Sequence, residues 1–246
     1  MKKISLILLL LLTFLIAGKY EKIAFPSKDG LEISAFLYSD HNHSKPFILL
    51  FHQARFSKGE YLEIAPKLNQ LGFNVMAVDL RNGDTVNEIE NETSDRAFEQ
   101  DLDISYIATV PDIEASISYA RKYLALGKLL LWGSSYSAGL VLLVADYRSG
   151  IDGVLSFSPG EYYKKRGETY IQDNVTHLNM PIFITSAKDE KKTWWPIYQA
   201  IPSKEKVYFL PTSEGVHGAK TLWNNNPDNQ KYWESTSKFL KKFSGR

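Results

Sequence analysis

The chain has 246 residues, a net charge of +1 at pH 7, 44% hydrophobic residues and no cysteine. This length and composition are typical of a globular protein with one large or two small domains. The balanced charge gives no indication of nucleic-acid binding, and the lack of cysteine excludes disulfides, thiol catalysis and thiolate metal sites.

The N-terminal segment has the pattern of a secretory signal peptide. A positively charged start at residues 1–3 precedes an apolar run over residues 4–17, and Gly18 provides a small residue for cleavage. The run has about 14 residues, whereas a membrane-spanning helix needs about 20. We therefore predict a signal peptide over 1–18 and one exported domain over 19–246, periplasmic or secreted, without a stable membrane anchor. If the segment is not cleaved, it would anchor the protein in a membrane.

The rest of the chain alternates between apolar segments that favour strands and amphipathic segments that favour helices. Helices are expected over 59–71, 111–126, 193–200 and 228–243, and after a sharp turn at Ser135. Strands are expected over 20–25, 31–38, 46–51, 73–78, 151–157, 181–185 and 206–210, and from residue 128 to that turn. This alternation predicts an α/β domain with a mostly parallel sheet covered by helices on both faces.

Two connecting segments differ in composition from their surroundings. Residues 84–103 contain eight carboxylates and a single base, Arg96. We interpret this acidic segment as a solvated surface excursion, while attraction of a cationic substrate or of calcium remains open. The segment between Phe157 and Pro181 has about two dozen residues, which is too short for a large helical cap.

The segment 128–139 has the pattern of a buried strand, an abrupt turn and a helix. Ser135 stands at the tip of the turn, and the small residues Gly133, Ser137 and Ala138 surround it. A nucleophile elbow needs small neighbours because its serine is held in a strained backbone conformation. The pattern therefore favours Ser135 as a nucleophile.

Polar residues follow most of the predicted strands. In parallel α/β sheets ligands bind beyond the carboxyl ends of the strands, so these residues are candidates for a site. Among them a serine, an acid and a histidine follow one another in the chain, in the order typical of one class of hydrolase. The candidates are His52, Gln53, Ala54, Asp79, Asp84, Ser135, Glu161, Asp189, Glu190 and His217.

With these features the chain resembles the α/β-hydrolase superfamily, and within it the small, lid-poor branch of dienelactone-hydrolase-like and esterase-like proteins. The resemblance covers nearly the whole chain after residue 20 and implies an eight-stranded sheet without a large cap. Four motifs carry it: Phe51–Ala54, Asp79–Gly83, the turn at Ser135, and Lys188-Asp189 followed by Val216–Gly218.

The resemblance implies a catalytic triad of Ser135, Asp189 and His217. A serine hydroxyl becomes a good nucleophile when an imidazole accepts its proton, and the acid orients that imidazole. Two other carboxylates remain open as the acid. Glu190 is adjacent to Asp189, and Glu161 follows the preceding strand, where some members of the family carry the acid.

The resemblance also implies an oxyanion hole made of two backbone N–H groups. One comes from Tyr136 and the other from the loop after His52, which we expect to brace that loop. The family usually has a glycine where this chain has Gln53. Gln53 and Ala54 therefore both remain candidates for the second N–H group.

The implied function is hydrolysis of a carboxylic ester with a small or accessible acyl group, through an acyl-enzyme and without a metal or cofactor. The aromatic pairs Tyr162-Tyr163 and Trp194-Trp195 follow strand ends and either line an acyl pocket or belong to the core. The expected partner is a small-molecule ester. An acyltransferase, a serine peptidase and a non-catalytic binding protein remain alternatives.

Overall fold

A computed structural model of the protein describes residues 20–244, so the predicted signal peptide lies outside the described residues. The strands are β1 Glu21–Pro26, β2 Glu32–Tyr38, β3 Phe47–Phe51, β4 Asn74–Val78, β5 Leu129–Ser134, β6 Gly153–Phe157, β7 Ile182–Thr185 and β8 Lys206–Phe209. The helices are α1 Ile64–Gln70, α2 Glu92–Glu99, α3 Val110–Tyr123, α4 Tyr136–Tyr147, α5 Tyr170–Asp173, α6 Lys191–Ala200 and α7 Asn229–Leu240.

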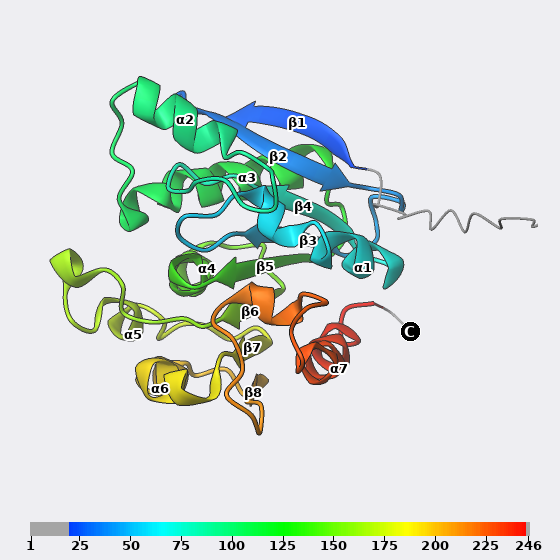
Figure 1. The fold of residues 1–246 in the computed structure, drawn as a ribbon, viewed down its shortest axis with the longest axis vertical. Coiled ribbons are helices and arrows are strands. Elements are labelled where there is room, and N and C mark those ends of the chain that lie inside the picture. Colours follow the sequence, from blue (N-terminus) through cyan, green and yellow to red (C-terminus); the bar gives the residue numbers. More distant parts are fainter. Residues whose placement is uncertain (1–19, 245–246) are drawn as a thin grey trace, which may run out of the picture.

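The strands of residues 20–244 form one eight-stranded sheet in the order β1-β2-β4-β3-β5-β6-β7-β8 (Figure 1). β2 runs antiparallel to both of its neighbours, β1 and β4. The remaining strands are all parallel to β4: β3, β5, β6, β7 and β8. The predicted fold class is therefore confirmed. The central strands are apolar and buried on both faces, as parallel strands under helical layers require.

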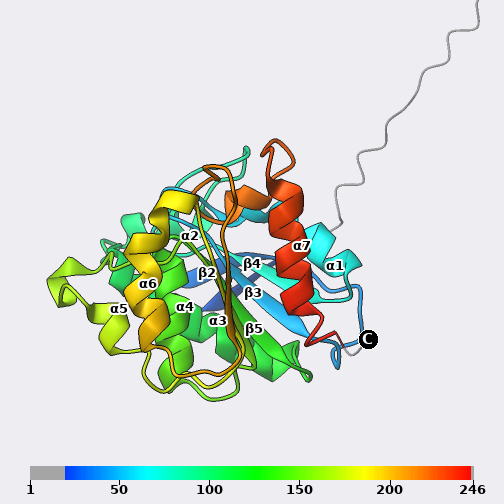
Figure 2. The ribbon, with the colours of Figure 1, turned by 90° about the horizontal axis from the view of Figure 1, so that it is seen from below.

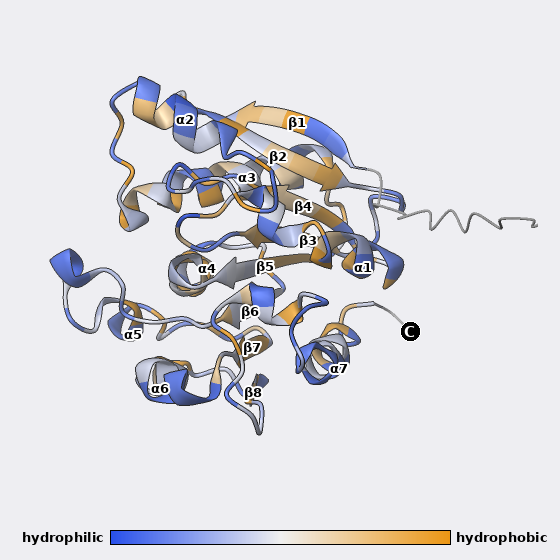
Figure 3. Ribbon diagram, in the orientation of Figure 1, coloured by the Kyte–Doolittle hydropathy of each residue, from blue (hydrophilic) through white to orange (hydrophobic). Residues whose placement is uncertain are grey.

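Helices cover both faces of the sheet. α1 and α7 lie on one face, and α3, α4 and α6 lie on the other (Figure 2). Each layer encloses its own apolar core, one with Leu68 and Phe239 and the other with Ile117 and Val141. The apolar residues concentrate on the strands and the polar ones on the outer surfaces of the helices (Figure 3).

The acidic segment is more regular than the composition predicts. It contains the helix α2, whose first turn is capped by the Asn91 side chain accepting from the N–H of Ser94 at 2.9 Å. Thr93 and Ala97 are buried, and the Thr93 hydroxyl accepts from the N–H of Ser34 in β2 at 2.9 Å. Seven of the eight carboxylates are exposed, but only Glu92, Asp95 and Glu99 belong to the helix, which packs on β2.

The connection between β6 and β7 is short, and it lies over the carboxyl-terminal edge of the sheet. It contains a 3-10 turn, Lys164–Arg166, and the single turn of α5. The helices of residues 20–244 are each too short or too polar to cross a lipid bilayer.

Candidate active site

Ser135 lies at a strained turn between β5 and α4. Its backbone has φ 59° and ψ −121°, a region that non-glycine residues rarely adopt. A Cβ atom at Gly133 would approach the carbonyl oxygen of Ser137 to 2.4 Å and the backbone N and Cα atoms of Ala138 to 2.6 Å. The small neighbours are therefore sterically required, and the turn has the geometry of a nucleophile elbow.

His217 faces Ser135 from the loop after β8. Its Nε2 atom lies 2.7 Å from the Ser135 Oγ, although the two residues are 82 positions apart in the chain. Gly218 has φ +76°, and a side chain there would collide with the Gln53 side chain and the Ser134 hydroxyl. The close approach of Gly218 to the elbow thus holds the imidazole over the serine.

The carboxylate that contacts the imidazole belongs to Glu190. Its Oε1 lies 2.5 Å from the His217 Nδ1, whereas Asp189 is exposed to solvent. Both residues belong to the 3-10 turn Lys188–Glu190 after β7, and the Glu190 N–H donates to the carbonyl of Ala187. The turn directs the side chain of its third residue, Glu190, towards His217 and leaves that of its second residue, Asp189, in solvent. The predicted position of Asp189 beside His217 is thus corrected to Glu190.

The electrostatic surroundings keep Glu190 ionised. Burial alone would raise the pKa of this carboxyl, but hydrogen bonds with His217 and Ser158 and the charge of His217 outweigh it and lower the pKa. Ser158 Oγ donates to Glu190 Oε2 at 2.6 Å and accepts from the Gly218 N–H at 2.8 Å. A buried hydroxyl therefore connects the acid to the loop that carries the histidine.

Glu161, the other alternative acid, has a structural position. Its two oxygens accept from the N–H groups of Ile171 and Gln172 at 2.7 and 2.8 Å. Glu161 thus caps the N-terminus of α5. Ser158, the first residue after β6, is the one that contacts the proposed acid, through its hydrogen bond to Glu190.

A buried hydrogen bond decides between Gln53 and Ala54 as the source of the second oxyanion N–H group. The Gln53 N–H donates to Glu60 Oε2 at 2.8 Å, so it is already used. The Ala54 N–H has no acceptor among residues 20–244, and Tyr136 is the first residue of α4, where N–H groups lack helical acceptors. Of the candidate N–H groups, those of Ala54 and Tyr136 therefore remain available to a substrate.

Glu60 lies completely buried behind the elbow. Besides the Gln53 N–H it accepts from the Ser134 hydroxyl at 2.8 Å, and that hydroxyl in turn accepts from the Ala219 N–H at 2.8 Å. Burial raises the pKa of Glu60 to about 7, against the lowering effect of these hydrogen bonds. One carboxyl thus links the oxyanion loop, the elbow and the histidine loop.

His52 supports the oxyanion loop through two buried hydrogen bonds. Its Nε2 accepts from the Leu80 N–H at 2.9 Å, so the proton is on Nδ1, which donates to the Gln53 carbonyl at 2.8 Å. Full burial lowers the pKa of His52 to about 4 and keeps the ring neutral. This bracing role agrees with the expectation from the sequence.

The Tyr162 side chain borders the reacting groups. Burial and the nearby charge of Glu190 raise its pKa to about 12. Its hydroxyl donates to the Ser158 carbonyl at 3.2 Å. Of the second aromatic pair, Trp194 is buried and donates to the Ser186 hydroxyl, which assigns it to the core.

Three polar residues of the site were not identified as such from the sequence. Glu60, Ser158 and Ser134 are not among the candidates that the sequence indicates. Their partners lie 74, 60 and 85 residues away, and no local pattern signals such contacts. Within residues 20–244 no three His, Asp or Glu side chains are gathered so as to hold a metal ion.

Solved structures with a similar fold include several hydrolases. An esterase from Pyrococcus furiosus has a TM-score of 0.70 and 13% identity, over 94% of this chain and 95% of that one. A dienelactone hydrolase from Anabaena variabilis has a TM-score of 0.71 and 12% identity, over 93% and 99%. The esterase domain of a Rhodothermus marinus protein has a TM-score of 0.65 and 13% identity, over 92% and 100%.

The sequence comparisons give no match: no protein-family model matches the chain, and no curated protein is similar to it. At identities of 12–13% the structural likeness establishes the fold alone. The chain therefore has the α/β-hydrolase fold, as its resemblance to that superfamily implies.

Proposed function

We propose, from the α/β-hydrolase fold and the contacts of Ser135, that the protein is a serine hydrolase that cleaves carboxylic esters. The observation that carries the proposal is the chain of short contacts from Ser135 Oγ to His217 Nε2 (2.7 Å) and from His217 Nδ1 to Glu190 (2.5 Å). The similar esterases and the dienelactone hydrolase support the choice of an ester as substrate.

The chemistry begins at Ser135. Because Nδ1 of His217 donates to Glu190, its Nε2 is free to accept the serine proton as Oγ attacks the ester carbonyl. The carbonyl double bond becomes a C–O⁻ group, which the N–H groups of Tyr136 and Ala54 stabilise. Glu190 stabilises the imidazolium that forms.

Breakdown of this intermediate completes the cycle. The imidazolium of His217 gives its proton to the leaving alkoxide, the C–O bond breaks, and Ser135 retains the acyl group. A water molecule then attacks the acyl carbon while His217 accepts its proton. Return of that proton to Ser135 Oγ releases the carboxylic acid and restores the enzyme.

The test is labelling of the protein with a fluorophosphonate probe, together with hydrolysis of phenyl acetate. We expect one label on Ser135 and at least about a 10³-fold loss of kcat/KM in Ser135→Ala, because the nucleophile is lost. Ser118→Ala, an exposed serine on α3, is the matched control and should retain both properties. Undiminished labelling of Ser135→Ala would contradict the proposal.

A further inference from the structure

A cavity of about 520 Å³ is lined by Tyr106 and Tyr163, which both contact Tyr136, the residue after the proposed nucleophile. Tyr106, Ile107, Tyr162 and Tyr163 form its walls. Tyr162, which lines the cavity, donates to the carbonyl of Ser158, and the Ser158 hydroxyl donates to Glu190. These contacts join the cavity to the elbow through Tyr136 and to the proposed acid through Ser158, so an aromatic-walled space adjoins the proposed site.

The walls of this cavity are rigid where they face the elbow. Tyr106 stacks on Tyr136 with ring centroids 4.5 Å apart and planes at 15°. Tyr163 is buried and its hydroxyl donates to the carbonyl of Tyr136. Tyrosine rings held in this way offer flat faces to a planar group, because aromatic rings favour offset stacking and edge contacts.

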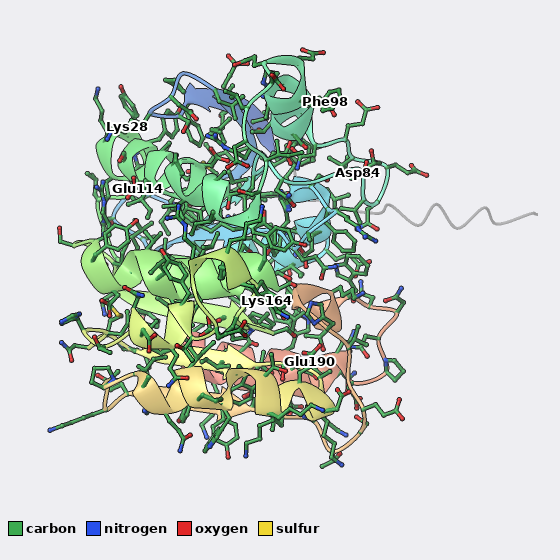
Figure 4. The ribbon with its side chains drawn as sticks, turned by 90° about the vertical axis from the view of Figure 1, so that its left-hand side faces the viewer. Lys28, Asp84, Phe98, Glu114, Lys164 and Glu190 are labelled. Atoms are coloured by element: carbon green, nitrogen blue, oxygen red, sulfur yellow. The ribbon has the colours of Figure 1, made fainter. Side chains whose placement is uncertain are left out.

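The rim of the cavity is strongly basic. Lys164, Lys165 and Arg166 follow Tyr163 directly, line the cavity and are exposed. Among residues 20–244 none of the three forms an ion pair. Lys164 and Glu190 are both labelled on the side of the molecule that Figure 4 views.

One carboxylate, Asp103, also lines the rim. Its Oδ1 accepts from the Ser105 N–H at 2.8 Å, and these hydrogen bonds to Ser105, with the nearby charge of Lys165, lower its pKa. Asp103 therefore offsets only one of the three cations. The rim keeps an excess of positive charge over an otherwise aromatic cavity.

We propose, on the basis of the ester hydrolysis proposed above, that the substrate is an ester in which one half carries an aromatic ring with an anionic substituent. The ring lies between Tyr106 and Tyr162, and the anion binds to Lys164, Lys165 and Arg166. Ammonium and guanidinium groups donate charge-assisted hydrogen bonds to carboxylates and related anions. The same features disfavour cationic and long aliphatic esters.

The test compares two pairs of esters with the full chain. In the first pair the acyl group is benzoyl with a para-carboxylate or a para-carboxamide. In the second pair the same substituents are on the phenol of an aryl acetate. The measured quantity is the ratio of kcat/KM for the anionic ester to that for the neutral ester, and the pair that responds identifies which half of the ester enters the cavity.

The decisive variant replaces Lys164, Lys165 and Arg166 by alanine. Exposed ion pairs are individually weak, but three cations act together here, so we expect the ratio to fall by about 10-fold. The control replaces Lys45, Lys238 and Lys241, which are exposed and do not line the cavity, and it should leave the ratio unchanged. Comparing variants with the wild-type protein cancels the intrinsic reactivity of each ester.

Two further measurements separate the charge from the ring. Raising the salt concentration from about 0.01 to 1 M shortens the Debye length from about 30 to 3 Å and should lower the wild-type ratio. A carboxylate on a linear acyl chain should be cleaved more slowly than the aromatic acid ester. Equal rates for the two would overturn the aromatic half of the proposal.

An unchanged ratio for both pairs in the triple alanine variant would overturn the assignment of the rim. If Ser135 is still labelled by the fluorophosphonate in that case, ester hydrolysis stands and only the substrate class is wrong. An absence of labelling in the wild-type protein would instead contradict the proposed function itself.

Discussion

The two sides of the Ser135 site differ in how deeply their polar groups are buried. On the side of β3 and β5, His52, Glu60 and Ser134 are fully buried and hydrogen-bonded. On the side of β7 and β8, the side chains of Glu190 and His217 keep 24% and 35% of their surface exposed. The nucleophile and the oxyanion groups are therefore held rigidly, whereas the proton-transfer groups remain in contact with solvent and substrate.

This difference follows from what each side has to do. Stabilisation of a developing oxyanion depends on donors that are already in place, because reorienting them during the reaction costs free energy. A histidine that exchanges protons with an alcohol and with water has to reach both. The basic residues Lys164, Lys165 and Arg166 after β6 are exposed and lie outside the buried network.

The largest effect on activity is expected at Glu190, the proposed acid on the more exposed side of the site. Glu190→Gln should lower kcat about 10³- to 10⁴-fold, because the neutral amide no longer stabilises the imidazolium of His217. Asp189→Asn is the matched control and should stay within about twofold, since Asp189 is exposed. Steady-state kinetics on phenyl acetate measures both. A larger loss in Asp189→Asn would restore the original assignment.

The buried side is tested by Glu60→Gln. The folded pKa of Glu60 is about 7 against an ordinary value of 4.5, so this carboxyl binds its proton more tightly in the folded state. Its stabilising contribution is complete below pH 4.5 and is lost as the pH rises through 7. The loss amounts to about 3 kcal/mol in the free energy of unfolding.

Urea unfolding at several pH values between 4.5 and 8 measures this contribution. The wild-type protein should lose more stability over this range than Glu60→Gln, which does not titrate. Asp79, whose pKa burial raises to about 6, is present in both proteins and cancels in the comparison. Parallel stability curves would show that Glu60 does not titrate in the folded protein.

A smaller effect is expected where the two sides meet, at Ser158. Ser158→Ala removes the donor to Glu190 and the acceptor of the Gly218 N–H, and should lower kcat about 10-fold with KM within about twofold. Ser156→Ala, which removes one buried hydrogen bond to Ala138, is the control. Both variants should lose about 1–2 kcal/mol of stability.

The pH profile of kcat/KM separates positioning from general destabilisation. In Ser158→Ala the pKa of Glu190 should rise, because one hydrogen bond that lowers it is lost. The acid limb of the profile should therefore move to higher pH in Ser158→Ala and stay in place in Ser156→Ala. Identical profiles would limit Ser158 to a structural role.

The fold and the turn at Ser135 could be predicted from the sequence because both depend on local patterns, whereas the pairing of Ser135 with His217 across 82 residues followed from the family resemblance. Buried strands and the small residues around Ser135 are visible in short windows. Which of the adjacent residues Asp189 and Glu190 points towards His217 depends on how the turn after β7 folds. The local sequence, which contains both carboxylates, does not show this. The regular structure of α2 was missed because Thr93 and Ala97 are its only buried residues.

The contacts of Glu60 also constrain the order of events in folding. Its carboxyl meets Ser134 across 74 residues, and Ser134 meets Ala219 across a further 85. Such non-local contacts form late, after the loops between them have closed. During synthesis the site would thus be completed only once the chain beyond Ala219 has emerged, so catalytic activity would report the last stage of folding rather than formation of the sheet.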